Sequence, residues 1–327
     1  MISDDDTVDE DAEVDLEKET TETSRDDAPQ NVLEGEYLDL PHGKDFDDHS
    51  ARLLTISRPV RTIVIAGPVS SGKTTLLLSM YELFLKGSMP GWLFSGCGTL
   101  HGFEQRCHPS RIESNRAIAH TERTLTNRED GVRYLHLKMS RETEPDAPLD
   151  FLFTDLTGEI YEEASHSTEV CKELGFVAIC DHFVVLIDGE RLSSKLTRHS
   201  AIQEASTLVR TMLDSNVLGS QSFIRILLTK ADAFAPTASA ADLNSFRVDA
   251  VDYLRTQFGD RVASLTFSEV AARPSQASEV PFGQGIVELL DHWASVGPRE
   301  RSMQLNRSPS ACLRESQAFF YRHFRYL

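Results

Sequence analysis

The residues with the clearest chemical purpose lie in one phosphate-binding pattern. A buried-strand pattern at residues 62–66 leads into Gly67-Pro68-Val69-Ser70-Ser71-Gly72-Lys73-Thr74, which matches G-x-x-x-x-G-K-[ST]. The two glycines permit backbone N–H groups to converge on the α- and β-phosphates at the start of the next helix. Lys73 is expected to reach the β- and γ-phosphates, and the Thr74 hydroxyl is the expected magnesium ligand. The pattern predicts binding of a nucleoside triphosphate through Gly67, Ser70, Ser71, Gly72, Lys73, Thr74 and Thr75.

A second group of chemically useful residues follows an apolar strand at residues 149–154. The strand ends in Asp155-Leu156-Thr157-Gly158-Glu159, a D-x-x-G pattern. A carboxylate at the tip of a strand beside the phosphate-loop strand can reach magnesium through water, which makes Asp155 the second expected magnesium residue. Gly158 offers a backbone N–H group, with no side chain in the way, that can sense a γ-phosphate. The pattern is short, however, and occurs by chance in many proteins.

Alternating strands and helices must position these residues. Strands are predicted at 132–139, with one face exposed, and at 149–154, 182–187, 223–228 and 264–267; helices are predicted at 76–85, 193–214 and 284–295. This alternation predicts an α/β fold with a doubly wound, mostly parallel sheet, in which ligands bind at the carboxyl ends of the strands. Each of the nucleotide motifs lies at such an end.

The chain of 327 residues has a net charge of −18, and most of that charge lies near its start. Residues 1–30 carry thirteen acidic residues against Lys18 and Arg25, and residues 31–50 add six more against Lys44. A segment with so few large apolar residues cannot bury enough surface to offset the entropy of ordering. Residues 1–50 are therefore predicted to be a disordered acidic tail, either a solvating leader or a docking arm for a basic partner. The remainder has a net charge near zero, which argues against general nucleic-acid binding.

Domain limits and compartment follow from the same composition. We predict a nucleotide-binding domain at 51–298, with a long insertion at about 87–131, and an aromatic-basic extension at 299–327 that packs on the domain or contacts a partner. The start lacks the pattern of a secretory signal, and no apolar run is long enough to span a bilayer. Five cysteines without a disulfide spacing indicate a reducing compartment, so a cytoplasmic protein is expected. Cys97, His101, Cys107 and His108 match no common zinc module and are expected to be ordinary loop residues.

The order of the motifs resembles that of Ras-like and translation-factor-like P-loop GTPases. A phosphate loop, a D-x-x-G turn, the sequence Thr229-Lys230-Ala231-Asp232 and a turn led by Ser268 follow one another, and the resemblance covers residues 61–295. The segments IAGPVSSGKTTLL and FTDLTGE also resemble the double-GTPase family of bacterial conflict systems. The resemblance implies a G-domain topology, GTP or GDP with Mg²⁺ as ligands, and a protein partner or a second GTPase.

The same resemblance implies how the base would be recognised. Asp232 would accept hydrogen bonds from the guanine N1–H and exocyclic amine, Lys230 would lie over the base plane, and Thr229 would support the turn. Backbone N–H groups near Ser268, Glu269 and Val270 would donate to O6. Adenine would leave buried groups unpaired at about 1–3 kcal/mol each. Taken alone, residues 229–232 fit a strand-to-loop turn with surface charges equally well.

Two departures from the Ras-like pattern concern hydrolysis. Where a glutamine usually follows the D-x-x-G glycine and orients water, this chain has Glu159, whose carboxylate would repel a γ-phosphate unless protonated or turned away. Hydrolysis is therefore expected to be slow or dependent on a partner. The threonine that closes over magnesium must come from the loop before residue 132, where Thr124 is our choice, ahead of Thr126 and Thr121. Arg123 and Arg191 are candidates for an arginine finger in cis, although each also fits an ordinary surface arginine.

These observations support three hypotheses from different functional classes. The leading one is a GTP-binding regulatory switch with Lys73, Thr124, Gly158 and Glu159 as catalytic residues, and Thr74, Asp155 and Thr124 around the metal. The second is a nucleotide-binding scaffold that hydrolyses little or nothing. The third is an ATP-using P-loop enzyme, which Asp232 disfavours.

Overall fold

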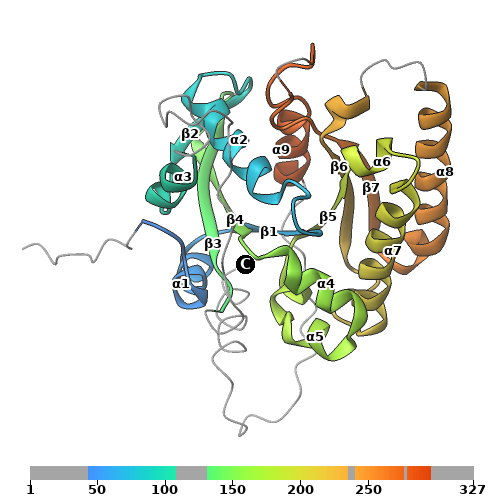
Figure 1. Cartoon of the computed structure of the whole chain (residues 1–327). Helices are drawn as coiled ribbons and strands as arrows, with labels where there is room; N and C mark the ends of the chain where they lie inside the picture. The colour runs from blue at the N-terminus through green and yellow to red at the C-terminus, as the bar shows by residue number, and fades with distance from the viewer. Residues whose placement is uncertain (1–42, 108–130, 235–239, 276–277, 296–327) are drawn as a thin grey trace, which may run out of the picture. The chain divides into compact units, whose positions relative to one another are not determined.

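A seven-stranded sheet lies at the centre of the part of the chain that the computed structural model describes, residues 43–107, 131–234, 240–275 and 278–295 (Figure 1). The strand order is β2-β3-β4-β1-β5-β6-β7. In this order, each pair of neighbours from β4 to β1, β5, β6 and β7 is parallel. The pairs β2–β3 and β3–β4 are antiparallel. The strands are β1 (Val60–Ala66), β2 (Trp92–Gly96), β3 (Tyr134–Arg141), β4 (Glu144–Thr154), β5 (His182–Asp188), β6 (Phe223–Thr229) and β7 (Ser264–Glu269). This mostly parallel α/β sheet confirms the predicted fold class.

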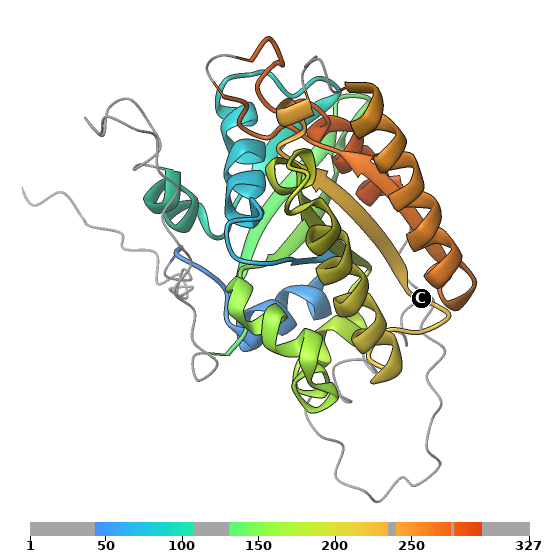
Figure 2. The same ribbon diagram turned by 45° about the vertical axis from the view of Figure 1, so that its right-hand side comes forward.

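Helices cover both faces of the sheet because successive strand residues point to opposite sides. In β1, Val64 and Ala66 face one apolar cluster, while Ile63 and Ile65 face the other. The first cluster is covered by α4 (Gly158–His166), α5 (Thr168–Glu173), α7 (Arg198–Asp214) and α8 (Ala240–Phe258); the second is covered by α2 (Lys73–Leu85), α3 (Leu100–Cys107) and α9 (Ile286–Ser295). Figures 1 and 2 show the two layers from views 45° apart.

Burial on both faces explains why the central strands read as continuous apolar runs. Every residue of β5 is buried, and so are eight consecutive residues of α2 from Leu76 to Leu83. A helix that is apolar all round must lie inside the domain, which fixes the start of α2 at the carboxyl end of β1. The phosphate loop therefore connects two elements that are held by the core.

The folded domain begins earlier than the predicted boundary at residue 50. Helix α1 (Asp48–Ser57) is capped by the Asp47 side chain, which accepts a hydrogen bond from the Ser50 N–H group. Phe46 is buried and pairs with Tyr134 of β3 through two backbone hydrogen bonds. The acidic composition of residues 31–50 predicts disorder. In the structure, however, Phe46 pairs with β3 and Asp47 caps α1, so the end of this segment belongs to the folded domain. Residues 1–42 and 296–327, with the predicted tail and aromatic-basic extension, lie outside the described residues.

Three other elements differ from the sequence-based expectation. Strand β3 is almost wholly buried rather than half exposed, because its polar residues His136 and Ser140 are enclosed by neighbouring segments. The helix expected at 193–214 begins later, as α7 at Arg198, and a separate short helix, α6 (Gly189–Ser193), precedes it. The predicted insertion contains β2 and α3, which extend the sheet and cover its second face. Contacts with distant parts of the chain, such as the pairing of β2 with β3, help to stabilise these short elements.

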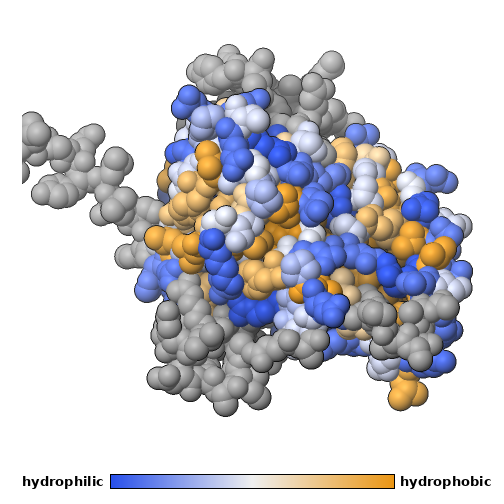
Figure 3. Space-filling view, turned by 90° about the horizontal axis from the view of Figure 1, so that it is seen from above, coloured by the Kyte–Doolittle hydropathy of each residue, from blue (hydrophilic) through white to orange (hydrophobic). Residues whose placement is uncertain are grey.

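The face shown in Figure 3 carries several hydrophobic patches separated by hydrophilic residues. Large apolar side chains that are exposed come from different elements and include Leu85, Leu93, Phe94, Leu196 and Val248. Scattered exposure of this kind is normal for a protein surface. No helix among the residues that the structure describes is long and apolar enough to cross a membrane.

The fold makes a prediction about acid stability through His182, the first residue of β5. Its side chain is 2% exposed, and burial, with nearby His292 and Arg225, lowers its pKa to about 3. The ordinary pKa is 6.5, so between these values the unfolded chain binds a proton that the native protein does not. We expect the free energy of unfolding to fall as the pH drops below 6.5, by up to about 1.4 kcal/mol per pH unit from this group.

Denaturant unfolding between pH 7 and pH 4 tests the assignment by comparing wild type with His182→Phe. The variant should show the shallower pH dependence, because it removes the group that is forced to stay neutral. His49→Gln, which changes an exposed histidine of α1, serves as the control. Equal slopes for wild type and His182→Phe would contradict the prediction.

Candidate nucleotide-binding site

A cleft of about 730 Å³ lies at the carboxyl ends of the central strands. Its walls come from five separate segments: the phosphate loop with the start of α2, the D-x-x-G turn, Glu190 after β5, the turn after β6, and the loop after β7. The predicted residues that line it are Ser70, Ser71, Gly72, Lys73, Thr74, Thr75, Gly158, Glu159, Thr229, Lys230 and Asp232. The fold therefore brings together motifs that are more than 150 positions apart in the sequence.

The phosphate loop ends in backbone geometry that only glycine adopts without strain. Gly72 precedes α2 with φ of 96°, in the left-handed region. Ser70 also has a positive φ, of 64°. Two left-handed residues within three positions curl the backbone before the helix begins, so that the first N–H groups of α2 open towards the cleft. This arrangement suits an anion such as a phosphate.

A hydrogen bond from β6 holds the phosphate loop in place. The Thr229 hydroxyl donates to the Ser71 carbonyl over 2.7 Å, and it lies 3.2 Å from the Ile187 carbonyl. Thr229 and Ser71 are both buried. The Ser71 hydroxyl oxygen, by contrast, is buried and has no hydrogen-bond partner among the residues that the structure describes. The loop is thus tethered from its inner side while its outer side faces the cleft.

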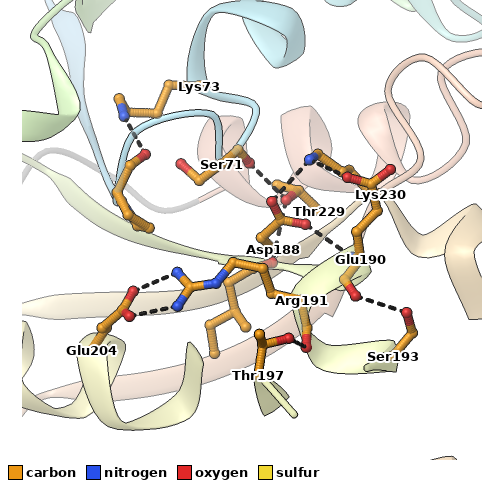
Figure 4. Close-up of polar contacts among 12 residues, drawn as sticks. Ser71, Lys73, Asp188, Glu190, Arg191, Ser193, Thr197, Glu204, Thr229 and Lys230 are labelled. Carbon is orange, nitrogen blue, oxygen red and sulfur yellow. Dashed lines mark hydrogen bonds and ion pairs between the residues drawn. The ribbon is translucent and has the colours of Figure 1, made fainter. Parts of the chain in front are cut away.

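The ammonium group of Lys73 lies against its own loop (Figure 4). It donates to the carbonyls of Gly67 and Pro68 over 2.8 and 2.9 Å. Gly67 does not line the cleft, but its carbonyl is one of the two acceptors for Lys73. A β- or γ-phosphate would attract this ammonium group more strongly than a neutral carbonyl does.

Gly158 is pressed against the phosphate loop. A Cβ atom at this position would lie 2.4 Å from the Val69 nitrogen and 2.7 Å from the Pro68 carbonyl carbon, closer than real contacts allow. Gly158 starts α4, whose Glu162 accepts a hydrogen bond from the Val69 N–H group over 3.3 Å. Glu159, next in the helix, is half-buried and lines the cleft. The D-x-x-G turn therefore brings a carboxylate to the phosphate end of the cleft.

The other end of the cleft contains the two charged residues expected to recognise a base. Asp232 accepts a hydrogen bond from the Ser275 N–H group over 3.0 Å. Lys230 donates to Asp188 over 2.8 Å and to Glu190 over 2.7 Å (Figure 4). Burial alone would lower the pKa of Lys230, but the two carboxylates raise it above its ordinary value. The lysine is consequently a fixed cation beside Asp232.

The residues expected to contact the base oxygen are not in the cleft. Strand β7 runs two residues further than predicted, so Ser268 and Glu269 lie within the sheet, beside α8, and the Val270 N–H group donates to Leu228 in the neighbouring strand. Residues of the loop that follows, Ala272, Arg273 and Ser275, line the cleft instead. A turn can begin only where strand pairing ends, and no local pattern marks the two additional paired residues of β7.

Arg273 anchors this loop to the helix that starts at the phosphate loop. Its guanidinium lies 2.6 Å from Glu82 of α2, and the Glu82 side chain is 10% exposed. A largely buried ion pair holds its partners firmly because losing either one would leave an uncompensated charge. The base end and the phosphate end of the cleft are thus connected through α2.

Asp155, the expected second magnesium residue, follows β4 and is buried, but it does not line the cleft. The Arg106 guanidinium of α3 donates to its carboxylate over 2.7 Å. Strand β4 does pair with β1, as the prediction required. Thr74 lines the cleft. The two expected metal residues therefore follow adjacent strands, β1 and β4, but one lines the cleft and the other is paired with an arginine.

The other predicted residues have different positions. Thr124, Thr126, Thr121 and Arg123 lie outside the described residues. Arg191 does not line the nucleotide cleft but binds Glu204 of α7 through both guanidinium nitrogens, over 2.6 and 2.5 Å (Figure 4). Within the described ranges, no group of three or more histidine, cysteine or acidic residues could hold a metal.

The fold and the cleft define a P-loop nucleotide-binding domain with the motif order of GTPases. A phosphate loop follows β1, a D-x-x-G turn follows the adjacent β4, and a T-K-x-D turn follows β6. The chain belongs to the Double-GTPase 2 family, whose model matches residues 61–294. No curated protein matches it.

Several solved structures resemble the chain at low sequence identity. The signal recognition particle receptor SRb-GTP/SRX complex from Chaetomium thermophilum gives a TM-score of 0.36 with 14% identity, covering 68% of this chain and 94% of that one. The S. cerevisiae Ski7 GTPase-like domain bound to GTP gives 0.37 with 16% identity, over 77% and 53% of the two chains. The elongation factor SelB from Methanococcus maripaludis, in complex with a GTP analogue, gives 0.34 with 11% identity, over 73% and 34%. The chain therefore spans about half of the Ski7 chain and about a third of the SelB chain.

The contact at Gly158 makes a prediction about the coupling between α4 and the phosphate loop. Gly158→Ala should lower the free energy of unfolding by about 1–3 kcal/mol, because the added methyl group overlaps the Val69 backbone. Gly175→Ala is the matched control, since no atom lies within 4 Å of its added Cβ atom. Thermal and denaturant unfolding of both variants measure the difference. Equal stability of the two variants would show that α4 does not pack on the loop as described.

The tether from Thr229 makes a second prediction. Thr229→Val keeps the side-chain shape but removes the hydrogen bond to Ser71, which should lower the free energy of unfolding by about 1 kcal/mol. Nucleotide affinity should fall several-fold as the loop loses its inner support, and calorimetric titration measures this. Thr55→Val removes the same kind of bond within α1 and should leave affinity unchanged. An unchanged affinity in Thr229→Val would contradict the role of the tether.

Proposed function

We propose that the protein is a GTP-binding regulatory switch. The observation that carries this proposal is a single cleft with a phosphate loop at one end and Asp232 with Lys230 at the other. Its volume of about 730 Å³ is within the range of sites that bind small-molecule ligands. A binding site for a triphosphate and a base at opposite ends of one cleft fits a nucleoside triphosphate.

Guanine would be selected by the complementarity of its edge to the residues at the base end. The Asp232 carboxylate accepts hydrogen bonds, which guanine donates from N1–H and its exocyclic amine. Backbone N–H groups of the loop containing Ala272, in place of those predicted at 268–270, would donate to O6. Adenine would present a donor where the loop donates and an acceptor where Asp232 accepts, leaving buried groups unpaired.

Magnesium would be held by oxygen atoms at the phosphate end. Hydroxyl and carboxylate oxygens are the ligands that this ion prefers, and Thr74 and Asp155, which follow the adjacent strands β1 and β4, would supply one of each. The bound ion would neutralise charge on the β- and γ-phosphates. Lys73 would add a second positive charge from the loop, and the N-terminus of α2 would add partial charges. The chain's own residues therefore favour a triphosphate over a neutral ligand.

Hydrolysis in this protein would be slow or would require a partner. Glu159 occupies the position where a neutral side chain would orient water, and its carboxylate lines the cleft. An ionised carboxylate there opposes the approach of a negatively charged γ-phosphate. The same observation favours a second candidate function, a nucleotide-binding scaffold that hydrolyses little or nothing. Turnover distinguishes the two.

A partner would read the bound nucleotide, and Thr124 would close over the metal. GTP would order the segment containing Thr124 and the turn at Gly158, and loss of the γ-phosphate would release them. Family membership and the resemblance to conflict-system GTPases support a protein partner or a second GTPase, and a role in bacterial defence. Five cysteines without a disulfide-framework spacing fit a cytoplasmic protein.

Competition binding tests the proposed function. Labelled GTP is displaced by GTP, GDP, ATP and XTP in the presence of Mg²⁺, with wild type, Asp232→Asn and Lys73→Ala. Wild type should prefer guanine nucleotides. Asp232→Asn should bind GTP about tenfold more weakly, or weaker still, and should bind XTP more tightly than wild type does. The reason is that the new amide donates a hydrogen bond where xanthine carries a carbonyl. Lys73→Ala should weaken all triphosphates alike.

Phosphate release measured on the same samples separates the two candidate functions. Slow release that a partner accelerates supports the switch, and tight binding without release supports the scaffold. Preference for ATP in wild type, with no exchange of specificity in Asp232→Asn, would overturn the guanine assignment.

A further inference from the structure

The carboxylate expected to serve magnesium already has a cationic partner. Arg106 Nη2 lies 2.7 Å from Asp155 Oδ2, and the two side chains are 15% and 4% exposed. The guanidinium is also anchored to its own helix, because Arg106 Nη1 donates to the Gly102 carbonyl over 3.1 Å. A charge-assisted hydrogen bond of this length between largely buried groups is a strong interaction. Asp155 is therefore neutralised by the chain itself.

A second acceptor for the same guanidinium lies nearby. Asp45 Oδ2 is 3.9 Å from Arg106 Nη2, and Asp45 Oδ1 is 3.6 Å from Arg133 Nη1. The backbone of Arg133 accepts a hydrogen bond from the Asp155 N–H group. Arg106 thus lies between two carboxylates, one close and one slightly too far for a hydrogen bond. A rotation of its side chain can exchange one carboxylate for the other.

Helix α3 itself is held, so the movable part is the side chain. Phe103 and Cys107 are fully buried in the core. The Gly102 N–H group donates to the Gly43 carbonyl over 2.9 Å, and a Cβ atom on Gly102 would lie 1.7 Å from the Lys44 carbonyl oxygen. A helix packed this closely on residues 43–45 keeps Asp45 within reach of Arg106.

We propose that Arg106 is a positioning residue that competes with magnesium for Asp155, with Asp45 as its alternative acceptor. The guanidinium of Arg106 and a magnesium ion are both positively charged, so they would repel each other if both bound the Asp155 carboxylate. Without the metal, Arg106 pairs with Asp155; when Mg²⁺ enters with GTP, Arg106 moves to Asp45. The Mg²⁺ concentration needed to retain nucleotide is therefore set by the difference in free energy between the contact of Arg106 with Asp155 and its contact with Asp45. This inference rests on the proposed function.

Magnesium titration of nucleotide retention tests the competition. The release of a fluorescent GTP analogue is measured as Mg²⁺ is varied, for wild type, Arg106→Gln and Asp45→Asn. Arg106→Gln should lower the Mg²⁺ concentration for half-maximal retention by about tenfold, the equivalent of one charged hydrogen bond. Asp45→Asn should raise it, because the displaced guanidinium then has a poorer acceptor. Arg261→Gln, which removes an exposed pair with Asp214, should leave it unchanged.

Opposite shifts distinguish competition from a merely structural role. If Arg106 only stabilised the fold, both substitutions would weaken retention, and thermal unfolding without nucleotide would show parallel losses. Unchanged or parallel midpoints in both variants, with wild-type retention intact, would overturn the competition and leave the proposed function standing. Absence of Mg²⁺-dependent GTP retention in wild type and in Arg106→Gln would overturn both.

Discussion

The close approach of the D-x-x-G turn to the phosphate loop is the constraint on which the rest of the site depends. Gly158 leaves no room for a Cβ atom beside Val69. On the inner side, Thr229 fixes the Ser71 carbonyl from β6. The loop is therefore held between the end of β6 and the start of α4, and neither contact exists unless β4, β1, β5 and β6 are adjacent in that order. These two contacts hold the phosphate loop in a shape that suits an anion.

Ion pairs extend this organisation to the base end of the cleft. Lys230 is fixed by Asp188 and Glu190, so the cation beside Asp232 does not move freely. Arg273 ties the loop after β7 to α2, the helix that begins at the phosphate loop. A ligand that contacts both ends would therefore meet a largely preformed site and would lose less entropy on binding than it would in a mobile one. This rigidity favours selection of the base over adaptation to it.

The charge around Asp155 follows a different principle, because it would allow exchange. Arg106 pairs with Asp155 and has a second carboxylate, Asp45, 3.9 Å away. The domain would thus combine a fixed phosphate loop with an exchangeable charge pair. Glu159 adds a further negative charge at the same end of the cleft. Binding and hydrolysis would thus be controlled by the electrostatics of three carboxylates, with the fold providing the frame that keeps them close.

Local patterns in the sequence determined the fold class, the phosphate loop, and the positions of Gly158 and Asp232, because glycine geometry, buried strands and strand ends leave signals within a few residues. Only the tertiary structure decided the remainder. The extent of β7 puts Ser268 and Glu269 in the sheet and leaves Ala272 to line the cleft, because strand length depends on the neighbouring strand. The pairing of Arg106 with Asp155, across 49 positions in the chain, depends on how α3 packs on the sheet, and no local pattern encodes that contact.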